Sequence, residues 1–406
     1  MKKAVVFGPG RIGCGFVGQL LYDSGYEVVF VGREAIIDHL SRVGRYVVRL
    51  TDGVRAREVD VRGVRALRMS EVDAVAEEIA DADLVAVSVG PRNLGAIAPV
   101  LAAGLARRTT PVNVIAFENC PDPGQTLREA VLGVNPCLYD KGHGFSGALV
   151  SRIVTQRQGN LEGDQPLVFL GDPTTSFIVH GPSLRKPLPR IEGLRAVEDY
   201  GAWATKKLYT FSAGHAAAAY LGALKGYRYI HSAIRDPEIR SSVLAAMEEG
   251  QRGLARRYGP DLAGDGAELL EIICRFENAA LNDPVSRVGR DPRRKLGPDD
   301  RLVGAARLAE EAGVSPRRLA LAAAAAICFD CGAGKPNPAA EETAETLHTV
   351  SGLDASTGIG QQVSEAVSRI GEWREADNVL LSLKELVWSW ARCPLMPQPV
   401  PLRKIG

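Results

Sequence analysis

The sequence predicts an N-terminal α/β domain followed by a mostly α-helical C-terminal domain. Strand-like apolar runs alternate with helical patterns through about residue 130, which is typical of a doubly wound, mostly parallel sheet. Short strands and turns over residues 144–181 indicate an antiparallel extension of that sheet. From about residue 195 onward, helical periodicity dominates. We place the domains at 1–194 and 195–392, with a proline-rich tail at 393–406.

A glycine motif follows the first predicted strand, Ala4–Phe7. It reads Gly8-Pro9-Gly10-Arg11-Ile12-Gly13 and leads into a helical pattern over Cys14–Leu21. This strand–GxGxxG–helix order is the dinucleotide-binding motif of a Rossmann domain. Gly8 would permit the tight turn, Gly10 the approach of a pyrophosphate, and Gly13 close packing of helix on strand. The helix N-terminus, with Arg11 and Ile12, would face the phosphates. The alternative is a structural glycine turn without a ligand.

The second strand, Glu27–Val31, ends in residues that bear on the choice of cofactor. Many NAD sites carry an acidic residue here that binds the ribose 2′-hydroxyl. This chain has Gly32 and then Arg33, which suits a 2′-phosphate, so NADP is slightly favoured. Glu34 keeps NAD open, and Arg33 could be only a surface residue. The predicted cofactor is therefore NAD(P)(H).

Two further strands end in candidate binding loops. Asp83–Val89 ends at Gly90, and Val112–Phe117 ends in Glu118-Asn119-Cys120. Ligands of such sheets bind at the carboxyl ends of the strands, so we expect Gly90 and Asn119 at the cofactor. Two later runs, Pro166–Leu170 and Ser176–Val179, are expected to extend the same sheet.

A helix is predicted over Ala196–Ala223, and it carries the candidate catalytic residues. At 3.6 residues per turn, Lys207 and His215 fall on one stripe, with Ser212 on its flank. The small apolar residues that follow suggest burial, which lowers the pKa of a lysine and makes it a usable base. The alternative is that Lys207 reaches solvent and His215 is a satisfied core histidine.

Composition narrows the class of protein. The chain has 406 residues and a net charge of +1, which indicates neither nucleic acid nor a membrane surface as a partner. The longest apolar run, Leu319–Phe329, is too short to span a bilayer. Seven scattered cysteines argue against a disulfide framework, and we expect a cytoplasmic protein. The Cys328/Cys331 pair alone is weak evidence for zinc, and the histidine spacing indicates no metal.

A basic segment follows in the second domain. Five basic residues and one acid lie between Arg287 and Lys295. Such a cluster suits an anionic substrate group such as a phosphate, although a solvated basic loop would have the same composition.

Several of these segments together resemble one family. FGPGRIGCGFVGQLL, AVSVGPRNLGAIAP, the lysine–histidine helix and RFENAALNDPVSRVGRDPRRKL are similar to the mannitol-1-phosphate 5-dehydrogenase family of polyol-specific long-chain dehydrogenases/reductases. The resemblance implies a metal-independent site with the signature K-x4-N-x2-H, in which Lys207 and His215 match. The lysine would be the general base, and the asparagine and histidine would hold the carbinol oxygen. Asn119 matches an asparagine near the nicotinamide, and Arg287 and Lys295 match residues that contact substrate.

The chain departs from this family at two places. Ser212 stands at the signature asparagine, and a segment like VDSAVDR is replaced by Ser146–Arg152, so that Gly147 and Ser151 stand where aspartates are usual. We expect hydride transfer between NAD(P)(H) and a phosphorylated polyol or keto-sugar of the mannitol 1-phosphate/fructose 6-phosphate type, by a monomer or homodimer, with Ser151 at the substrate. A phosphorylated cyclitol or another keto-sugar is the alternative substrate. A non-catalytic nucleotide-binding protein is the third hypothesis.

Overall fold

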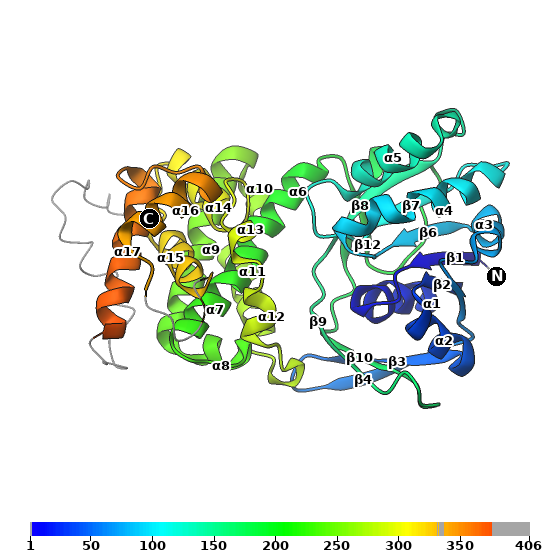
Figure 1. Cartoon of the computed structure of the whole chain (residues 1–406), viewed down its shortest axis with the longest axis horizontal. Helices are drawn as coiled ribbons and strands as arrows, with labels where there is room; N and C mark the ends of the chain where they lie inside the picture. Colours follow the sequence, from blue (N-terminus) through cyan, green and yellow to red (C-terminus); the bar gives the residue numbers. More distant parts are fainter. Residues whose placement is uncertain (1, 331, 333–336, 376–406) are drawn as a thin grey trace, which may run out of the picture. The chain divides into compact units, whose positions relative to one another are not determined.

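The computed structural model describes residues 2–330, 332 and 337–375, which form two compact units (Figure 1). The first unit holds the chain up to Lys207 together with Asn278–Asp283. The second holds Leu208–Glu277 and the chain from Pro284 onward. The domain boundary after residue 194 stays a prediction. The helix expected over residues 376–390, the tail at 393–406 and Cys331 lie outside the described residues.

The first unit is built on a sheet in the order β12-β11-β8-β7-β6-β1-β2-β5. All neighbours from β8 to β5 run parallel, whereas β11 pairs with β8 in the antiparallel sense and β12 pairs with β11 in the parallel sense. The doubly wound, mostly parallel sheet with an antiparallel extension is thereby confirmed. The strands are β1 (Lys2–Phe7), β2 (Tyr26–Gly32), β5 (Arg65–Arg68), β6 (Leu84–Val87), β7 (Asn113–Ala116), β8 (Gly144–Val150), β11 (Phe177–His180) and β12 (Leu194–Val197).

Alternating residues of the central strands build two cores, one on each face of the sheet. Val5 and Phe7 pack with residues of α3 (Val72–Ala80), α4 (Leu94–Arg107) and α5 (Pro123–Val134). Ala4 and Val6 pack on the other face with residues of the helical segments within 13–43. Because both faces are covered, the strands read as continuous apolar runs, which is why they could be recognised in the sequence.

A second sheet, which was not expected, packs against the helical segment Gly13–Gly18, where a Cβ on Gly15 would meet Val154 and Phe169. Its order is β4 (Ala56–Arg62), β3 (Arg45–Thr51), β10 (Val168–Gly171) and β9 (Val154–Gln158). The prediction that Pro166–Leu170 extends the main sheet was therefore wrong. The ring of Phe169 on β10 packs edge-on against Tyr46 on β3 at 5.6 Å, and both belong to the core that faces the main sheet. β10 pairs with β3 and β9 instead of with a strand of the main sheet.

The segment Asn278–Asp283 belongs to the first unit because it is bonded to this second sheet. The side-chain amide of Asn278 donates to the carbonyl of Thr51 at 2.7 Å. The hydroxyl of Thr155 donates to the carbonyl of Leu281, also at 2.7 Å. The chain thus returns to the first unit for six residues in the middle of the helical half.

The helix after the glycine motif is present but begins in a wider form than predicted. Residues Gly13–Gly18 are π-helical, and α1 (Gln19–Asp23) continues them. A Cβ on Gly18 would lie 2.6 Å from the ring of Phe30 and 2.5 Å from the hydroxyl of Tyr46. The glycine therefore lets the helix lie directly on both aromatic rings.

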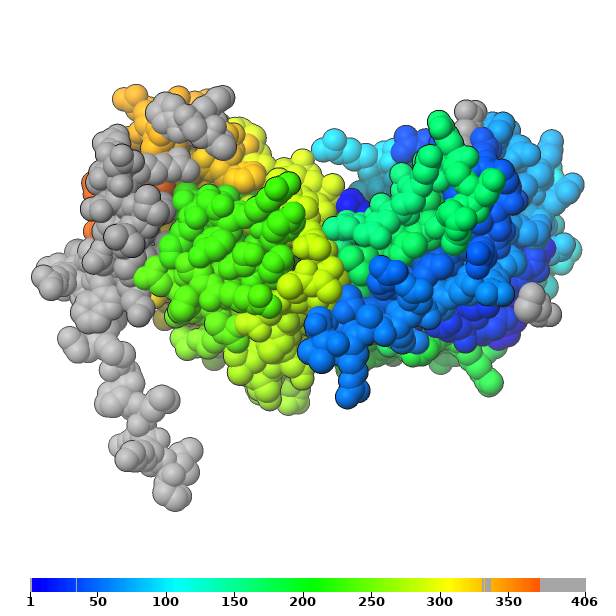
Figure 2. Space-filling view, turned by 90° about the horizontal axis from the view of Figure 1, so that it is seen from below, coloured from blue at the N-terminus to red at the C-terminus, as the bar shows by residue number. Residues whose placement is uncertain are grey.

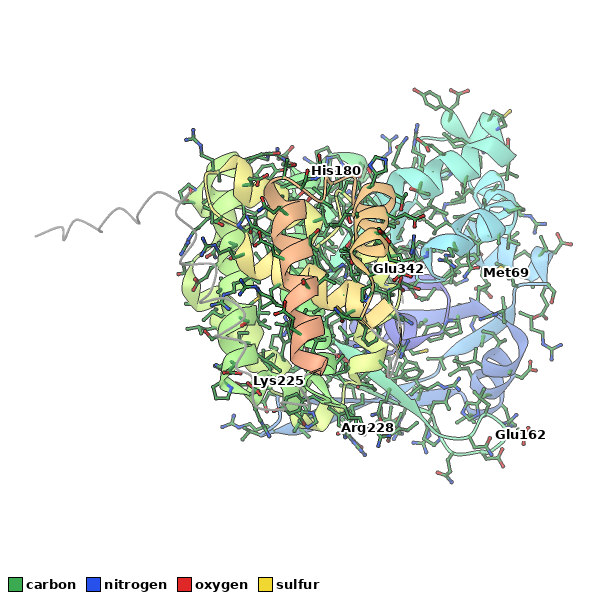
Figure 3. All side chains as sticks on the ribbon, turned by 60° about the vertical axis from the view of Figure 1, so that its left-hand side comes forward. Met69, Glu162, His180, Lys225, Arg228 and Glu342 are labelled. Atoms are coloured by element: carbon green, nitrogen blue, oxygen red, sulfur yellow. The ribbon has the colours of Figure 1, made fainter. Side chains whose placement is uncertain are left out.

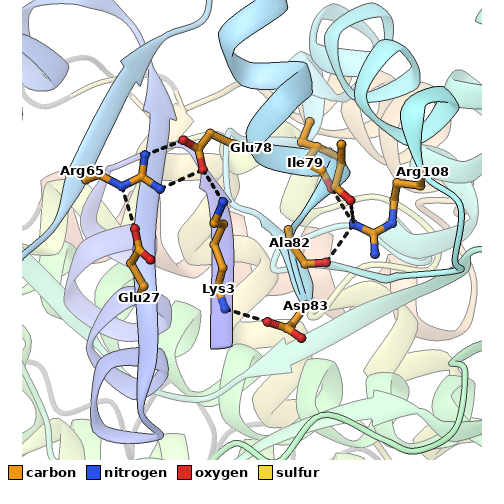
Figure 4. Close-up of polar contacts among 9 residues, drawn as sticks. Lys3, Glu27, Arg65, Glu78, Ile79, Ala82, Asp83 and Arg108 are labelled. Carbon is orange, nitrogen blue, oxygen red and sulfur yellow. Dashed lines mark hydrogen bonds and ion pairs between the residues drawn. The ribbon is translucent and has the colours of Figure 1, made fainter. Parts of the chain in front are cut away.

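The amino ends of the strands are closed by charged pairs (Figure 4). Arg65 at the start of β5 pairs with Glu78 on α3 and with Glu27 on β2, the latter at 2.6 Å. Glu78 also accepts from the ammonium of Lys3 on β1 at 2.9 Å. These pairs connect three neighbouring strands to the helix that covers them.

The second unit is mostly helical, as predicted. Its long helices bury apolar stripes rich in alanine, notably in α7 and α15. One face of this unit is formed by the segments coloured green to yellow in Figure 2. Its α-helices are α7 (Ala213–Leu224), α8 (Ile230–Arg235), α9 (Pro237–Tyr258), α10 (Pro260–Ala263), α11 (Gly266–Phe276), α12 (Val285–Gly289), α13 (Pro292–Lys295), α14 (Val303–Glu311), α15 (Arg317–Asp330), α16 (Ala340–Thr346) and α17 (Gly358–Glu375).

Asp236 and Glu238 lie at the start of α9, the longest helix among the described residues of this unit. Asp236 caps α9 by accepting from the backbone N–H groups of Glu238 and Ile239. Lys225, labelled in Figure 3, places its ammonium 2.7 Å from Asp236 and 2.9 Å from Glu238.

Within the residues described, no helix has the length and apolarity needed to cross a bilayer.

The helix predicted over Ala196–Ala223 differs from the structure in two ways. Its first residues belong to β12, which ends at Val197, and helical structure begins with α6 (Tyr200–Lys207). A π-helical segment, η5 (Leu208–Ser212), then precedes α7. Because a π turn holds more residues than an α turn, the stripe drawn from Lys207 to His215 at 3.6 residues per turn does not hold across it.

Candidate active site

The glycine motif forms a tight turn at the carboxyl end of β1. Gly8 has φ +87°, its N–H donates to the carbonyl of Val31 at 2.8 Å, and its carbonyl accepts from the N–H of Gly10 at 2.7 Å. A Cβ on Gly13 would collide with that same carbonyl. At Gly10, by contrast, a Cβ would meet no atom within 4 Å. The turn is therefore packed at Gly8 and Gly13 and open at Gly10, where the sequence predicted the approach of a pyrophosphate.

Arg11 and Ile12 continue this turn into the helix. Ile12 has helical φ and ψ immediately before the π-helical segment. The guanidinium of Arg11 donates to the carbonyl of Thr155 at 3.2 Å, which connects the motif to the second sheet. The predicted contact of these two residues with a cofactor stays a prediction.

The loops after β6 and β7 lie beside this turn and are bonded to each other. The hydroxyl of Ser88 donates to the carbonyl of Gly8 at 3.0 Å. The N–H of Gly90 donates to the carboxylate of Glu118 at 2.8 Å, and Asn119 follows as an exposed residue. Gly90 and Asn119 thus lie at the carboxyl ends of neighbouring strands, as the sequence predicted.

Glu118 is a titratable residue for which the sequence predicted no role. Burial raises its pKa to about 7, against the opposing effect of the hydrogen bond from Gly90. A carboxyl group with this pKa changes charge in the physiological range, which is a common property of functional sites. The signal in the sequence was its position directly after a buried strand.

The end of β2 bears on which dinucleotide the turn would hold. A Cβ on Gly32 would lie 2.6 Å from Cδ of Pro9, so a carboxylate at this position requires the turn to move. Arg33 is exposed. Arg68 aligns with Gly32 on the neighbouring strand β5, and its guanidinium lies 2.8 Å from Asp38. The next residue, Met69, labelled in Figure 3, donates its N–H to the carbonyl of Gly32 at 2.9 Å.

The two adjacent lysines of α6 differ in burial. Lys206 is buried with 8% of its surface exposed, and its ammonium lies 5.1 Å from the ring centre of Trp203. Lys207, the predicted base, is half-buried and is the last residue of α6. The buried position expected for Lys207 is thus held by its neighbour.

His215 lies on α7 of the second unit within an aromatic group. Its ring stacks on Phe276 with centres 4.7 Å apart and meets Phe211 edge-on at 5.8 Å. The imidazole is half-buried, as is Ser212 at the end of η5. These rings fix the plane of the imidazole, which a polarising role needs. The assembly of Lys207 with Ser212 and His215 stays a prediction.

The basic segment is more constrained than its composition suggested. Arg294 lies 3.1 Å from Asp300, and Arg293 lies 3.7 Å from Asp330. Lys295 is buried and donates to the carbonyls of Val288, at 2.6 Å, and Arg290.

Burial lowers the pKa of Lys295 to about 7, with a further contribution from Arg301 and Arg294. Arg287 on α12 is half-buried, and Ser151, directly after β8, is also half-buried. Substrate binding by Arg287, Lys295 and Ser151 stays a prediction. In the described part of the chain, no three His, Cys, Asp or Glu side chains gather as metal ligands do.

A doubly wound sheet with this glycine turn and these strand-end loops defines a dinucleotide-binding Rossmann protein. Comparison with known proteins identifies the family. The Mannitol dehydrogenase Rossmann domain matches residues 2–193, and the Mannitol dehydrogenase C-terminal domain matches residues 199–382. The chain belongs to the mannitol dehydrogenase family, and it is a nicotinamide-dependent polyol dehydrogenase.

Relatives named mannitol-1-phosphate 5-dehydrogenase match most of the chain. The mannitol-1-phosphate 5-dehydrogenase of Brevibacillus brevis is 37% identical over 91% of this chain and 98% of its own length. That of Bacillus licheniformis is 40% identical over 81% and 88%, respectively. Among solved structures, Pseudomonas fluorescens mannitol 2-dehydrogenase, in a ternary complex with NAD and D-mannitol, is 18% identical with a TM-score of 0.75 over 97% of this chain and 95% of its own. This last likeness concerns the fold.

Proposed function

We propose that this chain transfers a hydride between NAD(P)(H) and the secondary alcohol or ketone of a phosphorylated polyol, of the mannitol 1-phosphate/fructose 6-phosphate type. The observation that carries the proposal is the match to mannitol-1-phosphate 5-dehydrogenases over both halves of the chain. The bound nicotinamide would supply the hydride acceptor. The open position at Gly10 and the packed turn at Gly8 fit a dinucleotide phosphate.

In the proposed reaction, the side chains of the lysine–histidine segment handle the proton and the oxygen. As the carbinol carbon loses its hydride, the hydroxyl proton passes to the uncharged amine of Lys207, and a ketone forms. His215 and Ser212 donate hydrogen bonds to the carbinol oxygen, on which negative charge develops. In the reverse direction, the ammonium of Lys207 returns the proton. The reaction would need no metal ion.

Two residues bear on the choice of substrate. Gly147 and Ser151 lack the carboxylates that would accept hydrogen bonds from polyol hydroxyls. A substrate with fewer free hydroxyls on that side, such as a phosphorylated cyclitol or another keto-sugar, is therefore the second candidate. Arg287 and Lys295 are the proposed contacts to the anionic substrate in either case, with Asn119 near the nicotinamide.

The cofactor preference is proposed to lean toward NADP. A side chain on Gly32 has no room beside Pro9, so a carboxylate that would repel a 2′-phosphate is missing from the end of β2. Arg33 and Arg68 carry positive charge at the ends of β2 and β5, although Asp38 offsets that of Arg68. We also propose a cytoplasmic enzyme that acts as a monomer or homodimer.

The test is a reduction assay with purified protein. Fructose 6-phosphate with NADH or NADPH should consume the reduced cofactor, which its absorbance reports. Turnover with other phosphorylated ketoses or cyclitols alone would support the second candidate. Tight binding of the cofactor without turnover on any of them would favour a non-catalytic nucleotide-binding protein and contradict the proposal.

A further inference from the structure

A buried tyrosine of α6 occupies the space next to a glycine of the sheet. Tyr200 has 7% of its surface exposed and packs with Leu149 on β8 and Val197 on β12. A Cβ on Gly147, also on β8, would lie 2.5 Å from the hydroxyl of Tyr200 and 2.9 Å from the ring of Pro123. The phenol thus fills the place that any side chain at position 147 would enter.

Hydrogen bonding does not explain why residue 200 is a tyrosine. Within the described residues its hydroxyl makes no hydrogen bond, although it is fully buried. An unpaired buried hydroxyl destabilises the fold, so a phenylalanine would be the more favourable core residue. The oxygen does, however, extend the ring toward β8, to 2.5 Å from the point where a Cβ on Gly147 would lie.

The same helix carries the proposed base. Tyr200 and Lys207 are seven residues apart, so two turns of α6 place them on one stripe, roughly 10 Å apart along the axis. Trp203 lies between them and packs with the same cluster. The guanidinium of Arg195 lies 4.3 Å from the centre of its ring. The rotation and height of α6 on the sheet therefore set where the Lys207 side chain begins.

We propose that Tyr200 is a positioning residue for Lys207: by resting on Gly147, it fixes the height of α6 over β8 and thereby the place of the amine. This inference rests on the proposed function, in which Lys207 is the base. A methyl group at position 147 would have to push the hydroxyl away by roughly 1 Å to reach ordinary contact distance. A displacement of that size at a reacting group can lower a rate by about 100-fold.

The experiment is a double-variant cycle read by kcat, KM and the dissociation constant of NAD(P)H. Gly147→Ala should lower kcat by about 10- to 100-fold while the dissociation constant of the cofactor changes by less than about threefold. Gly147→Ala combined with Tyr200→Phe, which removes the phenol oxygen and leaves the contact with Pro123, should recover the part of the lost kcat that the phenol causes.

A matched control perturbs the same strand without touching the phenol. A Cβ on Gly124 would collide with the backbone of Ser146 and Gly147. Any loss of kcat in Gly124→Ala should therefore not be recovered by Tyr200→Phe. Equal recovery in both backgrounds would contradict the inference, as would an unchanged kcat in Gly147→Ala or a loss that Tyr200→Phe does not reverse.

A second variant covers the case in which Gly147→Ala does not fold. Tyr200→Leu shortens the side chain, and it should lower kcat by about tenfold with the binding of NAD(P)H retained. An unchanged kcat in this variant would overturn the inference. Lys207→Met separates the two levels of proposal. If it keeps its turnover, the proposed base is wrong. If it loses turnover while Gly147→Ala and Tyr200→Leu are harmless, only the role of Tyr200 is wrong.

Discussion

The two ends of the main sheet use the same kind of residue for opposite purposes. At the amino ends of the strands, Glu78 pairs with Arg65 and Lys3, and these pairs hold β1 and β5 to α3. At the carboxyl ends, Glu118 accepts from the N–H of Gly90, next to the open turn at Gly10. One end is closed by opposite charges, and the other is built from glycines and backbone N–H groups.

The pKa values of the two carboxyl groups express this difference. The hydrogen bond from Arg65 lowers the pKa of Glu78 to about 2. Burial raises the pKa of Glu118 to about 7. A carboxylate with cationic partners stabilises the fold at neutral pH, whereas one that is buried beside backbone N–H groups remains ready to change its charge. We therefore expect the charged pairs at the amino end to affect stability and the groups at the carboxyl end to affect binding.

The largest effect that would sharpen this comparison is expected at Gly10. Gly10→Val adds a side chain where no protein atom lies within 4 Å, so it should leave the melting temperature nearly unchanged. It should weaken the binding of NAD(P)H by about tenfold or more, because it fills the space left for the phosphates. Fluorescence titration measures this. Gly95→Ala, at an equally open position of α4, is the control and should bind normally.

At the amino ends of the strands, Glu78→Gln should lower the free energy of unfolding by about 1–2 kcal/mol without weakening the binding of NAD(P)H. Because the pKa of Glu78 is lowered, its contribution is present above the ordinary value of 4.5 and is lost as the pH falls toward about 2. Urea unfolding at several pH values tests this. A variant as stable as the parent at pH 7 would show that the charged pairs do not close this end.

Glu118→Gln should show the opposite dependence on pH. A raised pKa means that the stability contributed by the group is full below 4.5 and is lost as the pH rises through about 7. Glutamine keeps an acceptor for Gly90 and stays neutral, so the variant should be more stable than the parent at pH 8–9, by about 1 kcal/mol or less. Melting curves at pH 5 and pH 8.5 compare the two. Equal differences at both would contradict the assignment.

The smallest expected effect concerns Arg33. Arg33→Ala should weaken the binding of NADPH by roughly two- to fivefold and leave that of NADH nearly unchanged. The effect is small because an exposed charge interacts weakly with a phosphate in water. The difference should shrink in high salt. If Arg33→Ala lowers the affinity for NADH and NADPH equally, Arg33 does not distinguish the two cofactors.

The sequence predicted those parts of the molecule that depend on local pattern. The Gly8–Gly13 turn, the buried parallel strands and the helical second half could all be recognised, because apolar periodicity and turn glycines are local signals. The positions of Gly90 and Asn119 after two parallel strands were also predicted, and these strands are neighbours in the sheet. Their contact with a cofactor stays a prediction.

What depends on contacts between distant residues could not be predicted. β10 pairs with β3, and Phe169 packs against Tyr46, although these residues are far apart in the sequence. The sequence pattern also did not indicate that Lys206 is more buried than Lys207, or that a π-helical segment follows α6. The proximity of Tyr200 to Gly147 joins residues 53 positions apart, and no pattern within either segment indicates it.

The measurement that tests the central claim most directly compares kcat in Lys207→Met and Lys206→Met with the parent, alongside the dissociation constant of NAD(P)H. We expect Lys207→Met to lower kcat by about 100- to 10,000-fold with cofactor binding retained, since that is the contribution of a general base. Lys206→Met changes the neighbouring lysine on α6 and should lower kcat far less. A Lys207→Met enzyme that keeps most of its kcat, or a larger loss in Lys206→Met, would contradict the account.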